Sequence, residues 1–218
     1  DLNDWDSITT HADSIIKHSE ETSYALMEQL AKSSKAAGWK IARATSLEEA
    51  AIYIRTLAAD LEARSIVYSD HQVVANLDLN TALFDSGMES TLMAIQKPGV
   101  ISSDEQRSNL RKLVTKSDLG VTGVDYVIAD TGTCVIIPKR GVSRLVSLLP
   151  PVYVAVVERK QIIPDLGALM TLRRHAAISG NPSSYMSLIT GPSRTADIES
   201  TIVTGVHGPG EVHMVLIE

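Results

Sequence analysis

Apolar residues recur at helical spacing through the first 36 residues of the chain. From Leu26 to Ala31 they fall one, three and four positions apart, and charged or amide side chains fill the positions between them. The stretch from Asp1 to about His18 carries a weaker form of the same pattern, around Trp5 and Ile15. We therefore expect a helical N-terminal segment over residues 1–36.

From Gly38 onward, short apolar runs alternate with amphipathic stretches, which predicts an α/β domain over residues 37–218. The expected strands are 39–42, 65–68, 124–128, 134–137, 152–157, 185–189 and 212–217. The expected helices are 46–61, 103–116, 164–175 and 195–203. The run at 152–157 is almost entirely apolar, so we expect both of its faces to be covered.

Single residues predict further details of these elements. Ser46 is placed to cap its helix, and Glu49 follows at the spacing of a capping box. In the helix at 103–116, Leu110 and Leu113 are expected to face inward. A short glycine-containing turn at Thr131 separates two strands, which predicts an antiparallel pair and therefore a mixed sheet.

Composition excludes several classes of function. The formal net charge is −6, no block is rich in Lys or Arg, and aromatic residues make up only 4% of the chain, so nucleic acid is not an expected partner. No apolar run approaches the length needed to span a bilayer, and no signal-peptide pattern opens the chain. The single cysteine, Cys134, lies in an apolar run and is expected to be buried. A cytoplasmic location fits this cysteine usage.

One cysteine also cannot build an iron–sulfur cluster, a cysteine zinc site or an intrachain disulfide. No histidine pair has metal-ligand spacing, so no metal site is expected in this chain. The fingerprints of phosphate-binding and dinucleotide-binding loops are absent, as is the serine nucleophile elbow.

A first candidate for chemistry runs from Gly120 to Asp125 and continues to the turn from Asp130 to Thr133. Asp130 ends a buried strand, and strand ends in α/β sheets are where ligands bind. A buried carboxylate is costly unless it is paired or faces solvent. Alternatively, Asp130 and Thr131 build the turn through hydrogen bonds from side chain to backbone.

A second candidate runs from Ile189 to Glu199, where an expected strand breaks into a loop with Gly191, Ser193, Arg194 and Thr195. The hydroxyls, the guanidinium and the amides of a following helix start would together bind a carboxylate or phosphate. The alternative is a capped helix with an ion pair from Arg194 to Asp197 or Glu199.

A third candidate is His207, which lies between glycines at 205 and 208. Its exposed position would allow it to act as an acid or base near neutral pH. A lone histidine in a loop also serves structural roles, and His213 in the last expected strand is predicted to be a core or edge residue.

Together these motifs resemble the LUD domain family, of the lactate utilization protein C type. The resemblance rests on 120–133, 149–153, 190–199 and 205–209, and order and spacing match from about Ala37 to the end of the chain. It implies a Rossmann-like, three-layer domain related to sugar-phosphate isomerases and CoA-transferases. Many members carry Glu where Asp130 stands and His where Tyr153 stands. The shorter side chain of Asp130 would reach less far into a site, and Tyr153 removes one possible acid–base group.

The resemblance implies a role in oxidising L-lactate to pyruvate beside iron–sulfur partner subunits, which would hold the clusters that this chain lacks. In this hypothesis a cleft formed by the 130–133 and 190–197 loops binds a small carboxylate or other anion, and Asp130 and His207 transfer protons. The expected binding residues are Thr131, Gly132, Thr133, Gly191, Ser193, Arg194 and Thr195. Whether the chain is an enzyme stays open. The alternatives are a non-catalytic assembly or regulatory protein that senses a metabolite, and an isomerase or CoA-transferase-like enzyme.

Overall fold

The computed structural model describes residues 5–83, 87–94, 103–137, 143–183, 185–196 and 202–218. The α-helices are α1 (Trp5–Glu21), α2 (Ser23–Ala37), α3 (Leu47–Asp60), α4 (Gln72–Asn76), α5 (Leu79–Leu83), α6 (Ser103–Lys116), α7 (Ser143–Leu148) and α8 (Leu166–Ile178). The strands are β1 (Lys40–Ala44), β2 (Ser65–Ser69), β3 (Glu89–Met93), β4 (Leu119–Gly123), β5 (Tyr126–Ile128), β6 (Thr133–Ile136), β7 (Val152–Glu158), β8 (Ile162–Ile163), β9 (Ser187–Ile189), β10 (Arg194–Ala196), β11 (Ile202–Thr204) and β12 (Glu211–Ile217).

A parallel sheet of six strands forms the centre, in the order β1-β12-β7-β4-β2-β3. Successive side chains of a strand point to opposite faces. Along β7, Val154 and Val156 pack in the cluster on one face, whereas Tyr153 and Ala155 pack in the cluster on the other. Both faces are therefore covered, as the apolar run predicts.

A second sheet, ordered β8-β5-β6-β9, covers part of one face of the first. Strands β5 and β6 are antiparallel. The antiparallel pair predicted at Thr131 is therefore present, but it lies in this second sheet and not in the central one. The strand expected at 124–128 is shorter, Tyr126–Ile128, and a strand that was not predicted, Leu119–Gly123, precedes it, because the chain passes from the central sheet to the second one between Gly123 and Tyr126.

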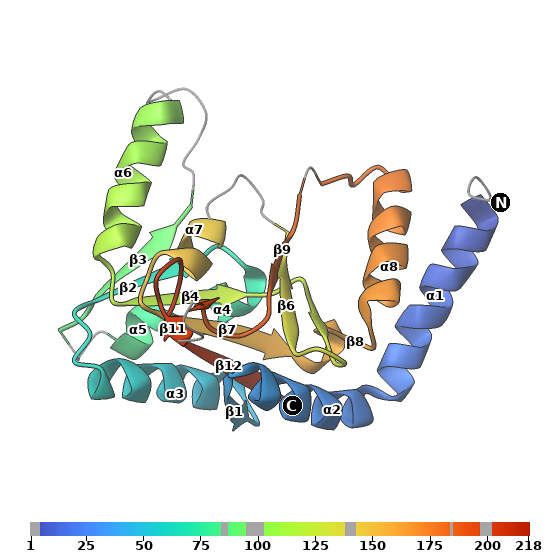
Figure 1. The fold of residues 1–218 in the computed structure, drawn as a ribbon, viewed down its shortest axis with the longest axis horizontal. Helices are drawn as coiled ribbons and strands as arrows, with labels where there is room; N and C mark the ends of the chain where they lie inside the picture. Colours follow the sequence, from blue (N-terminus) through green and yellow to red (C-terminus); the bar gives the residue numbers. More distant parts are fainter. Residues whose placement is uncertain (1–4, 84–86, 95–102, 138–142, 184, 197–201) are drawn as a thin grey trace.

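Helices complete the layers (Figure 1). Helices α3, α4 and α5 cover one face of the central sheet, and α2 packs with the second sheet on the other. Helices α1 and α8 lie side by side and cover the outer side of the second sheet. No helix in the described parts of the chain is long and apolar enough to cross a membrane.

The prediction of a helix at 195–203 is wrong. Strands β10 and β11 pair there in antiparallel fashion, with Arg194 opposite Thr204 and Thr195 opposite Val203; residues 197–201 lie outside the described part. Thr195 in β10 and Val203 and Thr204 in β11 are β-branched residues, which favour extended backbone. The anion site expected here therefore has no helix N-terminus whose amides could bind the anion.

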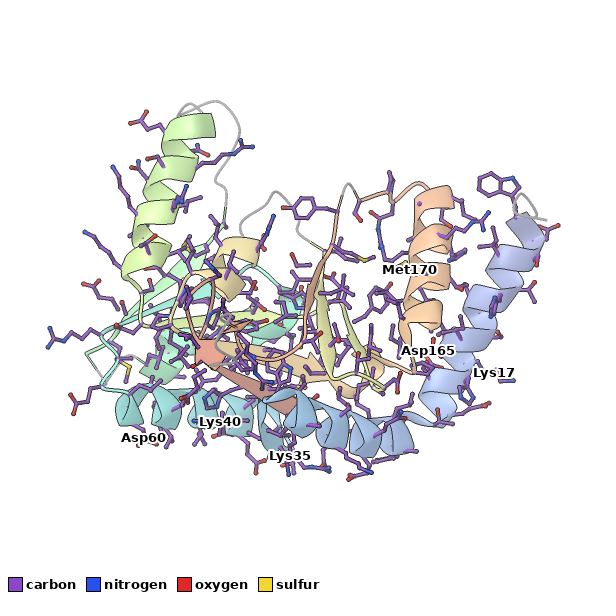
Figure 2. The ribbon with its side chains drawn as sticks, in the orientation of Figure 1. Lys17, Lys35, Lys40, Asp60, Asp165 and Met170 are labelled. Carbon is purple, nitrogen blue, oxygen red and sulfur yellow. The ribbon has the colours of Figure 1, made fainter. Side chains whose placement is uncertain are left out.

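Helix boundaries otherwise follow the local signals closely. The Ser46 hydroxyl accepts a hydrogen bond from the Glu49 amide (3.2 Å), as predicted, but the Glu49 carboxylate bonds to Thr45 and not to Ser46. Asp165 caps α8 at the position labelled in Figure 2. On α6 the prediction for Leu113 is wrong: this side chain is 48% exposed, and the neighbouring Val114 is buried instead.

Candidate functional site

The loop that contains Asp130 to Thr133 meets the loop that follows β9. Strands β6 and β9 pair directly, with Cys134 opposite Ile189. Beyond this pair the hydroxyl of Thr133 bonds to the hydroxyls of both Thr131 and Thr190, each at 2.7 Å. The structure therefore brings together two loops that lie far apart in the sequence.

Both loops pack on the last turn of α2. Gly132 (φ +67°) lies so close to Ser34 that a β-carbon there would be 2.6 Å from its Cα. Gly191 (φ +85°) lies against the carbonyl of Ala37, which a β-carbon would overlap. Positive φ and close packing each require glycine. The N–H of Gly132 already donates to the carbonyl of Ile128, which fixes the turn.

Arg194 reaches the same end of α2. Its guanidinium donates a hydrogen bond to the carbonyl of Ala37 (3.0 Å). This carbonyl belongs to the helix terminus, where carbonyls lack partners within the helix and the helix dipole is negative. The bond gives Arg194 a structural role at the helix end. The ion-pair partners considered for it, Asp197 and Glu199, lie outside the described residues.

Ser193 joins this loop to the one that carries His207. The Ser193 hydroxyl accepts a hydrogen bond from the His207 amide (3.3 Å), and the Ser193 amide donates to the Pro209 carbonyl (2.8 Å). The side chains of His207 and Asp130 are exposed, and Thr195 lies within β10. Thus, every predicted site residue lies in a described segment. Hydrogen bonds link the loops at 130–133, 190–195 and 205–209.

The loops at 130–133 and 190–195 form a loop cluster, which lies toward the amino ends of the central strands. The amide of Gly210, just before β12, donates to the carbonyl of Pro151, just before β7 (3.0 Å). Parallel α/β sheets usually bind ligands beyond the opposite, carboxyl ends of their strands.

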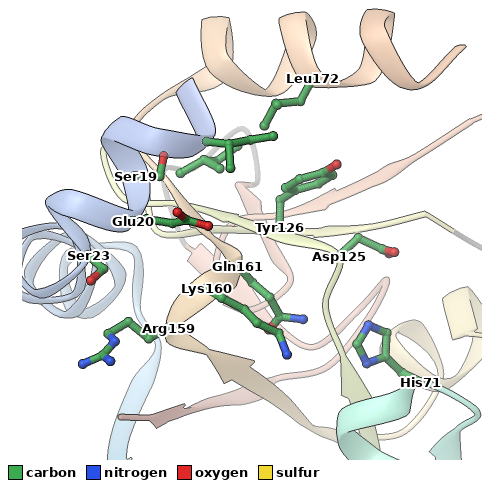
Figure 3. A pocket seen from close by; sticks show the side chains of 12 residues that line it. Ser19, Glu20, Ser23, His71, Asp125, Tyr126, Arg159, Lys160, Gln161 and Leu172 are labelled. Carbon is green, nitrogen blue, oxygen red and sulfur yellow. The ribbon is translucent and has the colours of Figure 1, made fainter. Parts of the chain in front are cut away.

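At those carboxyl ends lie two adjoining pockets, of about 550 and 160 Å³. His71 and Asp125 line both of them. Figure 3 shows the larger pocket, with His71 and Asp125 on one side and Ser19, Glu20 and Arg159 on the other. Asp125 ends the first candidate stretch of the sequence analysis, whereas the other four are functional candidates that sequence reasoning missed.

Local structure fixes His71 and Asp125. His71 caps α4 by accepting a bond from the Val73 amide (3.3 Å), and its ring lies where a side chain on Gly123 would be. The Asp125 carboxylate accepts a bond from the Ile137 amide (2.6 Å). The glycine-rich stretch that ends in Asp125 was the available sequence signal, whereas His71 lies in no comparable motif.

Two residues singled out in the sequence are core residues. Cys134 is fully buried, as predicted, and burial raises the pKa of its thiol. Tyr153 is also fully buried, its hydroxyl bonds to that of Thr122 (2.7 Å), and burial raises the pKa of this phenol well above its usual value. Within the described residues, no group of three His, Cys, Asp or Glu side chains is arranged to hold a metal ion.

His213 is buried in a polar network on β12, between β1 and β7, in agreement with the prediction of a core or edge residue. Its Nδ1 pairs with the hydroxyl of Tyr53 and its Nε2 with the carboxylate of Glu211, both at 2.7 Å. Glu211 also pairs with Lys40 (2.6 Å). Burial lowers the pKa of His213 more than the bond to Glu211 raises it.

We expect His213 to make the fold less stable below pH 6.5. Because its pKa in the folded state is lowered, the unfolded chain binds the proton first, and stability falls as pH drops through the unfolded value of 6.5. The slope for this one proton reaches at most about 1.4 kcal/mol per pH unit. Urea unfolding of His213→Gln between pH 7 and 5 should show a flatter dependence, whereas the exposed His18→Gln control should keep the original one.

The family model for the LUD domain matches residues 27–217. Lactate utilization protein B of Bacillus velezensis is 26% identical across the whole chain, which covers 53% of that protein. Lactate utilization protein C of Halalkalibacterium halodurans is 36% identical over an aligned region that covers 47% of this chain and 45% of that protein.

The chain thus spans about half the length of the curated relatives it matches. Among solved structures, a DUF162 family protein from Deinococcus radiodurans has the same fold, with a TM-score of 0.57 and 16% identity, covering 90% of this chain and 98% of that one. Since the family model matches nearly the whole chain, the protein belongs to the LUD domain family.

Proposed function

We propose that this chain acts in L-lactate utilization and binds a small carboxylate, such as lactate or pyruvate, at the loop cluster of residues 130–133 and 190–195. The names of its relatives, lactate utilization proteins B and C, support the process. The hydroxyl chain from Thr131 through Thr133 to Thr190 is the observation that supports the place, because it joins the two loops into one hydrogen-bonding surface.

Each residue has a proposed part in binding. A guanidinium has five N–H donors, so the bond to Ala37 holds Arg194 in place and leaves donors for a carboxylate. Thr131, Thr133, Ser193 and Thr195 supply hydroxyls, and Gly132 and Gly191 shape the loops. Asp130 and His207 would accept protons from the hydroxyl-bearing carbon group of lactate as it is oxidised. Electrons would leave through iron–sulfur partner subunits.

Calorimetric titration with L-lactate and with pyruvate tests this proposal. We expect Arg194→Ala to weaken binding about tenfold or more, since it removes a charge-assisted contact. Arg174→Ala, an exposed arginine on α8, is the matched control. Unfolding measurements on both variants separate the two roles of Arg194: lower stability with unchanged affinity would leave only its bond to α2, and the assigned binding role would be lost.

A non-catalytic, metabolite-sensing subunit is the second candidate function. The exposed position of Asp130 and the bond between Arg194 and a backbone carbonyl favour it, because both suit binding better than proton transfer. Lactate oxidation by the chain with and without iron–sulfur partner proteins distinguishes the two. Turnover that needs Asp130 and His207 supports the catalytic form, whereas turnover unaffected by Asp130→Asn and His207→Gln supports the sensing form.

A further inference from the structure

The pockets at the carboxyl ends of the central strands lie where the chain changes direction across the sheet. From β2 the chain moves outward to β3, returns across β2 to β4, and continues the other way to β7 and β12. Ser69 ends β2, Gly123 ends β4, and both line the smaller pocket. Crevices at such switch points are general ligand sites in open α/β sheets.

Two buried hydroxyls in these pockets have no hydrogen-bond partner among the residues that the structure describes. The Ser69 residue is 1% exposed and lines the smaller pocket, and Ser19 is 8% exposed and lines the larger one. A buried hydroxyl without a hydrogen bond is destabilising, so such groups generally have a partner. Both hydroxyl oxygens are buried as they stand, so a ligand in the pockets would supply the partner once the side chain turns toward it.

The size of the pockets indicates a ligand larger than a three-carbon acid. Small-molecule sites usually occupy 300–1,000 Å³, and the larger pocket, of about 550 Å³, lies within that range. It is distinct from the loop cluster, since none of the residues proposed there lines it.

The two ends of the site differ in chemistry. The smaller pocket offers the carboxylate of Asp125, the ring of His71 and the Ser69 hydroxyl, which suit the hydroxyls of a sugar. The larger pocket offers Tyr126, Ile163 and Leu172, which suit a planar ring. At its rim the guanidinium of Arg159 lies 4.2 Å from the ring centre of Tyr24.

From this arrangement we infer that the two pockets form one site for a nucleoside. The ribose hydroxyls bond to Ser69, His71 and Asp125, and the base lies along Tyr126 and Leu172. An acidic side chain that accepts bonds from ribose hydroxyls at a switch point is a recurrent solution in α/β proteins. This site is separate from the proposed lactate site, so either can fail without the other.

Calorimetric titration of the full chain with adenosine tests the inference. We expect binding to the wild type, about three- to tenfold weaker binding to Ser69→Ala because one hydrogen bond is lost, and binding at least as weak to Ser69→Val, which lacks the hydroxyl and adds apolar bulk at the smaller pocket. Because the Ser69 hydroxyl has no partner within the described part of the chain, Ser69→Ala should unfold at an unchanged or higher temperature without ligand. A purely structural serine would behave in the opposite way.

Ser14→Ala is the matched control, because this serine is exposed on α1 and bonds to its own helix. Its affinity for adenosine should equal that of the wild type. L-Lactate should not displace adenosine. The inference is overturned if adenosine does not bind at millimolar concentration, if Ser69→Ala and Ser69→Val bind it as tightly as the wild type, or if Ser14→Ala weakens binding as much as Ser69→Ala.

Discussion

Replacing Gly191 with alanine is expected to lower the free energy of unfolding by about 3 kcal/mol or more. Two effects add. At φ +85° an L-residue is strained, which costs about 1–2 kcal/mol. The new β-carbon would also overlap the carbonyl of Ala37, which is backbone and cannot rotate away. The loop must therefore move off α2 or the helix end must shift.

Gly180→Ala is the matched control for this change. Gly180 has the same φ of +85°, but a β-carbon there would meet nothing within 4 Å. We expect it to cost only the backbone strain, about 1–2 kcal/mol. Urea unfolding of the two variants measures the difference. Equal losses would mean that contact with α2 does not hold the loop.

Patterns within one element were enough to predict most of the fold. The capping residue Ser46, the apolar run of β7 and the turn at Thr131 each depend on neighbours close in sequence. The sheet to which a strand belongs depends on distant contacts. Gly123 and Tyr126 are only three positions apart, yet they belong to different sheets, and no local pattern encodes that step.

The β10–β11 hairpin shows the same limit. A polar loop followed by Thr195 and Asp197 is typical of a helix start, but pairing with a second strand decides the conformation of Thr195. The candidate site was predictable only where its residues form sequence motifs. The contact between Thr133 and Thr190 follows from the pairing of β6 and β9, and the proximity of His71 to Asp125 follows from the order of β2 and β4.

Helix α2 gives the second large expected effect, because its last turn supports both glycine turns of the loop cluster. Its own attachment to the domain depends on buried apolar side chains, among which Leu30 is fully buried against the second sheet and the central one. We expect Leu30→Ala to cost about 3 kcal/mol, within the 2–5 kcal/mol typical of buried leucines, since it leaves a cavity at this junction.

Leu166→Ala provides the control for the same chemical change at a side chain that is 47% exposed, and it should cost less than about 1 kcal/mol. Hydrogen exchange adds a local test. If α2 supports the loops, the amide of Ser193, which donates to Pro209, should exchange faster in Leu30→Ala than in Leu166→Ala when both are studied at equal global stability. Equal exchange rates would mean that the loops keep their positions without α2, and the hydroxyl bonds between Thr131, Thr133 and Thr190 would then be sufficient to hold them together.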